Sequence, residues 1–153
     1  MKNITISSLL LVICAFSCEN MADHKYTIKF YDHSSKNIMI VEGLVEEGLH
    51  LYPDTTLPAQ KPFLIQVNTN DYGEIISSNK WEGVISNIPS DTLSIYVFDK
   101  DTINAYDWSK IKSGYKVLKR YDLSINDLKK LNWIITFPPT ESMKDIHMYP
   151  PYK

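Results

Sequence analysis

Two cysteines, Cys14 and Cys18, are the only thiols in the chain, and both lie in the N-terminal stretch VICAFSCEN (residues 12–20). Ala15-Phe16-Ser17 places small residues at the first and third positions before Cys18, the pattern that cleavage of an export signal requires. Followed by cysteine, these residues resemble a bacterial lipobox, in which the cysteine is acylated on sulfur and becomes the mature N-terminus. They depart from the usual lipobox in Ala15, where Leu is commonest, and in the bulky Phe16. Cleavage there would leave Cys18 as the one thiol of the exported chain, open to oxidation unless modified. We therefore expect Cys18 to be the lipidation site, with a plain periplasmic protein as the alternative.

The segment before Cys18 has the parts of an export signal. Lys2 supplies a positive end, and the apolar run Ile4–Phe16 that follows is too short to cross a hydrocarbon layer, which takes about 20 residues. Its apolar side chains would lie on every side of a helix rather than along one stripe, which argues against a buried N-terminal helix. The sequence predicts a signal peptide over residues 1–17, a lipidated tether over 18–24 and one globular domain over 25–153.

Three acidic residues, Asp99, Asp101 and Asp107, lie close together in the sequence. Asp99-Lys100-Asp101 begins like a calcium loop, in which alternating side-chain oxygens reach one cation. The next alternate position is Ile103, and Lys110 stands at the twelfth, where such a loop carries a bidentate Glu. We therefore predict a solvated turn here, and we expect neither a metal nor a cofactor.

The histidines are spread along the chain without the H-x-x-x-H or H-x-H spacing of a metal site. The chain has no G-x-S-x-G motif, and its 5 glycines leave little material for a phosphate-binding loop. A Ser-His-Asp triad stays open, because such triads form in space and not in sequence. We expect that the protein is not an enzyme. The alternative is a small envelope hydrolase or metal-dependent enzyme, which would need histidines and acids to lie together in one pocket. The residues concerned are His24, His33, His50 and His147 and the acids Asp99, Asp101 and Asp107.

Aromatic residues are abundant, with 10 Tyr and 3 Trp. Exposed Tyr and Trp rings form rigid platforms for protein partners or sugars. Trp81 and Trp133 lie in apolar periodic patterns and are expected in the core, whereas Tyr106 and Trp108 fall in a predicted loop. We take Tyr106 and Trp108 as candidate binding residues, and we expect the tail Tyr149–Tyr152 to dock on its own domain.

The charge balance argues against a nucleic-acid partner. The chain has 16 Lys+Arg and 18 Asp+Glu, a formal net charge of -2, and no block of like charges. Binding to a phosphate backbone needs a basic stripe instead. The expected partners are the membrane, through the N-terminal lipid, and a protein or glycan that meets the loops of a monomeric, non-catalytic domain. A periplasmic protective inhibitor of a toxin is one form of such a module.

Short strands dominate the predicted secondary structure. Alternation of apolar and polar residues is clearest over 26–31, and 92–98 is the strongest strand because it is apolar on both faces. Residues 43–61 are predicted as an irregular connection and 68–79 as a polar loop. The full set of predicted strands is 26–31, 38–41, 62–67, 92–98, 115–121 and 133–137, with the first two forming a hairpin.

Three short helices are predicted from spacing and capping. Apolar residues at helical spacing over 81–88 predict a helix that ends before Pro89. Ser124 and Asp127 form a capping-box pattern, and Asp107 can begin a further helical turn that Gly114 ends. Strands with so few helices predict a mainly β fold, a single β-sandwich of the immunoglobulin or transthyretin kind decorated by two or three short helices. An α+β fold, with one sheet covered by short helices, is the alternative.

Three runs of the chain are similar to one family of sequences: IPSDTLSIYVFD (88–99), YKVLKRYDLSINDLKKLNWIITFPP (115–139) and MKDIHMYPPY (143–152). They resemble a family of small lipoproteins of uncharacterised activity from Gram-negative anaerobic gut bacteria, and together with the signal the similarity covers most of the chain. The resemblance implies a lipid-anchored protein of the cell envelope, expected at the outer membrane on its periplasmic or surface face. It carries over no activity, ligand or catalytic residue.

Overall fold

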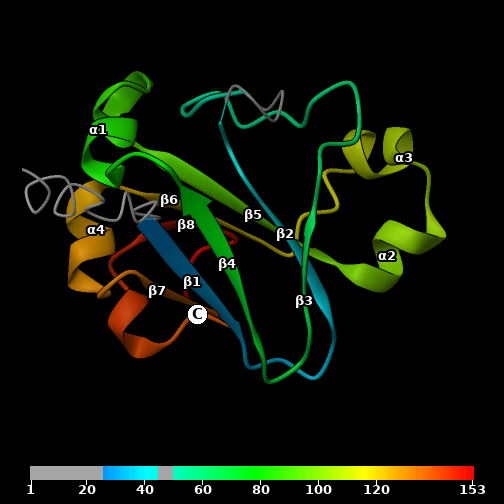
Figure 1. Ribbon diagram of the computed structural model, residues 1–153. Helices are drawn as coiled ribbons and strands as arrows, with labels where there is room; N and C mark the ends of the chain where they lie inside the picture. Colours follow the sequence, from blue (N-terminus) through cyan, green and yellow to red (C-terminus); the bar gives the residue numbers. More distant parts are fainter. Residues whose placement is uncertain (1–25, 45–49) are drawn as a thin grey trace, which may run out of the picture.

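The computed structural model describes residues 26–44 and 50–153, which form a mainly β fold of two sheets and four short α-helices (Figure 1). Cys18, His24 and the predicted signal peptide lie outside the described residues, so the lipidation site stays a prediction. Within the described ranges, no helix is long and apolar enough to cross a membrane.

The smaller sheet has three strands in the order β4-β1-β7. The central strand β1 (Tyr26–Asp32) is antiparallel to β4 (Tyr72–Ser77) and parallel to β7 (Ile134–Phe137). Side chains alternate across this sheet, as the period of two requires. Ile28 and Phe30 are therefore fully buried while the neighbouring Lys29 is only half-buried.

The larger sheet has five strands, and all its neighbouring strands are antiparallel. The strand order is β3 (Ile65–Val67), β2 (Ile38–Glu42), β5 (Leu93–Asp99), β6 (Lys119–Leu123) and β8 (His147–Tyr149).

The two sheets face each other across the main hydrophobic core. Each sheet contributes fully buried side chains, and burying apolar area of this kind is the main favourable contribution to folding. This facing pair of sheets is consistent with the predicted sandwich. Central members of the core are Phe30 and Ile75 from the smaller sheet and Ile40, Ile95, Tyr121 and Leu123 from the larger one.

The far face of the larger sheet is covered as well. Helices α2 (Lys100–Ala105) and α3 (Trp108–Ser113) place Ile103 and Ile111 against Tyr96 and Phe98 of β5 in a second hydrophobic cluster. The first six residues of β5 are consequently all buried, whichever face they point to. Helices on one face of a sheet are also the feature that the α+β alternative predicted.

Helices α1 (Trp81–Ser86) and α4 (Ile125–Lys130) lie together at the opposite side of the molecule from α2 and α3 (Figure 1). The predicted capping box is confirmed: the Ser124 hydroxyl accepts from the Asp127 N–H at 3.2 Å, and the Ser124 N–H donates to Asp127 Oδ2 at 2.9 Å. Two short 3-10 helices, Pro89–Asp91 and Glu141–Met143, complete the helical segments of the described chain.

The predicted hairpin between the first two strands is wrong. β1 and β2 belong to different sheets, and the turn between them crosses from one sheet to the other. β2 buries Ile38 and Ile40 on one face and Val41 on the other, so it needs cover on both sides, which the larger sheet provides. β1 has a half-exposed outer face and fits the smaller sheet.

The predicted loop over 68–79 is also wrong, because it contains β4. The inward positions of β4 hold Gly73 and Ile75, so a single apolar side chain marks its buried face. A Cβ on Gly73 would lie 2.8 Å from Val67 Cγ2, which shows that glycine permits close packing between the sheets here.

The predicted strand over 115–121 begins four residues too early. Gly114 caps α3, and Tyr115 follows in a turn with a φ of 41°, so strand β6 begins only at Lys119. The tail Tyr149–Tyr152 docks on the domain, as predicted: Tyr149 ends β8 and pairs with Arg120 of β6, and the Pro150 carbonyl accepts from Lys119.

Candidate functional site

The acids Asp99, Asp101 and Asp107 lie at the starts of α2 and α3, so the solvated turn predicted for this segment is wrong. Asp99 caps α2 by accepting from the Asp101 N–H at 2.9 Å, and Asp107 occupies the corresponding cap position of α3. Lys36 Nζ lies 3.5 Å from the second oxygen of Asp99. Among the described residues, no group of three or more His, Cys, Asp and Glu side chains could hold a metal ion.

The described histidines find partners other than these acids. The His33 ring stacks on Tyr31 with centroids 6.0 Å apart, and His50 Nδ1 lies 3.2 Å from an Asp54 oxygen. His147 pairs with Asp122 instead. Among the described residues, His33, His50 and His147 therefore do not join Asp99, Asp101 and Asp107 in the constellation that the enzyme alternative requires.

The two candidate aromatic residues have different environments. The Trp108 indole N–H donates to the Pro58 carbonyl at 3.0 Å, and its ring packs edge-on against Phe98 with centroids 5.9 Å apart. Trp108 therefore connects α3 to the irregular segment around Pro58. Tyr106 is 46% exposed, with Lys116 Nζ 4.9 Å from its ring centroid. Of the pair, Tyr106 has the surface that a partner could contact.

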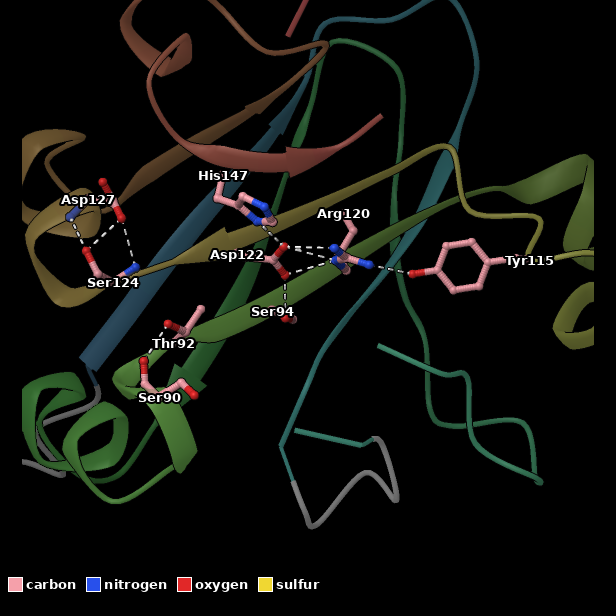
Figure 2. A network of polar contacts seen from close by, with 9 residues as sticks. All are labelled: Ser90, Thr92, Ser94, Tyr115, Arg120, Asp122, Ser124, Asp127 and His147. Atoms are coloured by element: carbon pink, nitrogen blue, oxygen red, sulfur yellow. Dashed lines mark hydrogen bonds and ion pairs between the residues drawn. The ribbon is translucent and has the colours of Figure 1, made fainter. Parts of the chain in front are cut away.

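The most elaborate polar arrangement lies on the far face of the larger sheet and is centred on Asp122 (Figure 2). In β6, Tyr121 and Leu123 point into the main core, so the alternating Arg120 and Asp122 point to the other face. Both charged side chains are buried, and a buried charge must be paired and hydrogen-bonded to be tolerated.

Asp122 accepts hydrogen bonds from three different side chains. The Arg120 guanidinium binds it from Nε at 2.9 Å and from Nη2 at 3.0 Å, a bidentate pair. Ser94 Oγ donates to Oδ1 at 2.6 Å from the neighbouring strand β5. His147 Nδ1 lies 2.8 Å from Oδ2 on the other neighbouring strand, β8. Since an ionised carboxylate only accepts, Nδ1 carries the proton in this contact.

The order of these residues differs from that of a nucleophilic triad. In a Ser-His-Asp triad the histidine lies between serine and acid and takes the serine proton. Here Asp122 lies between Ser94 and His147, and Ser94 is 1% exposed. The arrangement does not activate Ser94; it fixes the imidazole of His147.

One tyrosine contacts the fixed imidazole, and two more contact Arg120 beside it. His147 has 64% of its side chain exposed, and the Tyr52 ring meets its ring edge-on at 5.9 Å. Tyr149, which is 48% exposed, lies with its ring 5.8 Å from the Arg120 guanidinium carbon. Tyr115 contacts the Tyr149 ring at 5.7 Å and accepts from Arg120 Nη1 at 2.8 Å. We call Tyr52, Tyr115, Tyr149 and His147, with Arg120 and Asp122 beneath them, the tyrosine-rimmed site.

Hydrogen bonds hold Arg120, in the floor of this site, in its charged form. Burial by itself would lower the pKa of Arg120, but its hydrogen bonds to Asp122 and Tyr115 raise the pKa above its ordinary value. Burial raises the pKa of Tyr96, which lies next to Arg120 on the adjacent strand. The Tyr96 hydroxyl is buried and has no hydrogen-bond partner among the described residues.

Comparison of the chain with family models, with curated proteins and with solved structures finds no significant match. The tyrosine-rimmed site is therefore interpreted from its own geometry. The sequence signal for it was the run KRYDL, in which Arg120 and Asp122 alternate with apolar residues inside a strand. That pattern places two charges on one face of a strand, a position they occupy only as a pair.

Proposed function

We propose that this chain is an exported, lipid-anchored protein of the cell envelope whose domain is a non-catalytic binding module. The anchor rests on the lipobox pattern at Cys18 and on the export signal before it. The binding role rests on the tyrosine-rimmed site, which presents aromatic rings and an oriented imidazole to solvent.

The single observation that carries the binding role is the position of Asp122. Its two oxygens are used to hold Arg120, Ser94 and His147, so it orders a surface instead of facing a substrate. A rim of tyrosines with a polar floor is a common recognition surface, because each ring offers apolar area at low entropic cost and a polar edge. A protein or a glycan is the partner class that fits such a rim.

The anchor is tested by comparing Cys18→Ala with Cys14→Ala in membrane and soluble fractions of the native host. Cys18→Ala should release the protein from the membrane, whereas the matched change at Cys14, inside the predicted signal peptide, should leave it there. The intact mass of the wild-type protein should equal residues 18–153 plus a diacylglyceryl and an acyl group. Equal membrane recovery of both variants would refute lipidation at Cys18.

The binding role is tested by placing a photo-crosslinking phenylalanine at Tyr149 in cells. Phe63, which is 75% exposed and outside the site, is the matched control position. We expect a discrete adduct from position 149 that is absent from position 63 and is lost when His147→Ala is added. Protease and glycosidase digestion of the adduct then separates a protein partner from a glycan. The proposal fails if both positions give the same products.

One observation favours a second function, acid-base catalysis by His147. A carboxylate behind Nδ1 leaves the other ring nitrogen free to exchange protons, an arrangement found in general bases. Within the described residues no nucleophile contacts this imidazole, and Ser94 is engaged by Asp122. A hydrolase would lose its turnover in His147→Gln, whereas a binding module would show no turnover to lose.

A further inference from the structure

Lys119, at the start of β6, is a buried cation that has no acidic partner among the described residues. It is 9% exposed, and its ammonium donates to the Pro150 carbonyl at 2.8 Å. No carboxylate of the described residues lies within ion-pair distance of it, and a second cation, Lys153, acts on its charge. Buried lysines are normally paired, so this one leaves a positive charge uncompensated.

The ammonium lies in the wall of a pocket of about 290 Å³ at the end of the smaller sheet. The rest of the wall is apolar, with two aromatic rings and two proline pairs. These prolines offer apolar ring surface and no N–H groups, so Lys119 and Lys153 supply the charge of the pocket. The lining residues are Lys119, Phe137, Tyr152 and Lys153, with the Pro138-Pro139 and Pro150-Pro151 pairs.

We propose that this proline pocket binds a small organic acid, a carboxylate carried on a compact apolar or aromatic body. Lys119 and Lys153 would attract the carboxylate of the ligand, and the prolines and aromatic rings would contact its apolar part. A volume of 290 Å³ is near the lower end for ligand pockets and well above the roughly 150 Å³ that accepts a benzene ring. The ligand is therefore a single-ring acid or one of similar size.

The charge state of Lys119 supports this assignment. Burial lowers the pKa of Lys119, and the charge of Lys153 lowers it further. Both effects are reversed by an anion, because an opposite charge nearby favours the protonated amine. Binding of the acid and protonation of Lys119 should therefore strengthen each other.

The test is a titration of the ¹⁵N-labelled mature chain with benzoate, followed by NMR. Benzamide, which has the same shape without the charge, and acetate, which has the charge without the ring, are the matched ligands. We expect saturable shifts at Lys119, Phe137 and Tyr152 with benzoate, and affinities at least about tenfold weaker with the other two.

Variants complete the test. Lys119→Met should weaken benzoate at least about tenfold, and Lys153→Met, at an exposed position that cannot disturb the core, should weaken it less. Lys130→Met, which removes a half-exposed lysine paired with Asp145, should leave the affinity unchanged. The proposal is overturned if benzoate gives no saturable shifts at the pocket, or if benzamide binds as well as benzoate. Neither result bears on the tyrosine-rimmed site, which lies on the other face of the larger sheet.

Discussion

Asp122→Asn is the most informative perturbation of the tyrosine-rimmed site. Asparagine has the shape of aspartate and its one oxygen can still accept from Ser94, but its amide nitrogen cannot accept from Arg120 or His147 as Oδ2 does. The change therefore removes the negative charge and the hydrogen bonds to one oxygen while keeping the shape of the side chain. Arg120 then remains buried without a counter-ion, since the Arg120 and Asp122 side chains are 9% and 1% exposed. Removing one partner of a buried ion pair costs about 3–5 kcal/mol. We expect about 3 kcal/mol, because Tyr115 and the Tyr149 ring continue to contact the guanidinium.

A double variant separates the effect of an unpaired charge from the effect of altered side-chain shape. Combining Arg120→Met with Asp122→Asn removes both charges, and replacing a whole buried pair is often close to neutral. The double variant should therefore be more stable than Asp122→Asn alone, although it carries one more substitution. A defect caused by lost shape would give the opposite order.

Urea unfolding followed by tryptophan fluorescence at neutral pH measures these differences. Glu141→Gln, which removes the charge from an exposed pair with Lys144 and keeps an oxygen that can accept from Tyr152, serves as the control and should barely move the midpoint. An Asp122→Asn cost below about 1 kcal/mol, or a double variant no more stable than Asp122→Asn alone, would refute the view that Arg120 depends on Asp122.

Three further outcomes are expected from the same unfolding assay. Tyr96→Phe should raise the free energy of unfolding by about 1 kcal/mol, because it removes a buried hydroxyl that has no partner among the described residues. Tyr121→Phe should lower the free energy of unfolding by about 1 kcal/mol, because the Tyr121 hydroxyl donates to the Thr136 carbonyl at 2.8 Å. Equal effects of the two changes would contradict this difference. Gly73→Ala should cost about 1–3 kcal/mol, since its Cβ would overlap Val67; an unchanged midpoint would show that the sheets can separate there. Burial lowers the pKa of Lys119, so the unfolded chain holds this proton more tightly, and stability should rise with pH between the lowered value and 10.5. Comparing wild type with Lys119→Met across that range should show the rise only in the wild type.

Local patterns predicted the strongest elements of the fold correctly. β5 is apolar on both faces because both faces are covered, and α4 begins at a serine whose capping box is visible in the sequence. β4 was missed because Gly73 takes an inward position where an apolar side chain would have revealed the strand. The prediction that β2 pairs with β1 was wrong, because β2 joins the other sheet. The number of covered faces, and not the length of the preceding turn, decides which sheet a strand joins.

The candidate sites were harder to predict for a related reason. His147 lies 25 residues from Asp122 in the sequence and reaches it because β8 pairs with β6, a pairing that no local pattern specifies. Tyr106 and Trp108 were chosen because a loop was expected to expose both, but Trp108 lies over Phe98 in the second cluster. Which aromatic ring is exposed depends on the segment that packs above it.

Strand β6 contains buried charges of two kinds, an ion pair and a single lysine. All five of its residues are buried, and three of them are charged. Arg120 and Asp122 are two residues apart, so they lie on one face and neutralise each other, and the pair becomes a rigid support for His147. Lys119 lies on the other face, where the residue two positions on is Tyr121, so the strand supplies no acid for it. No acid of the described residues pairs with Lys119, and this open charge is why the ligand that we propose for its pocket is an anion.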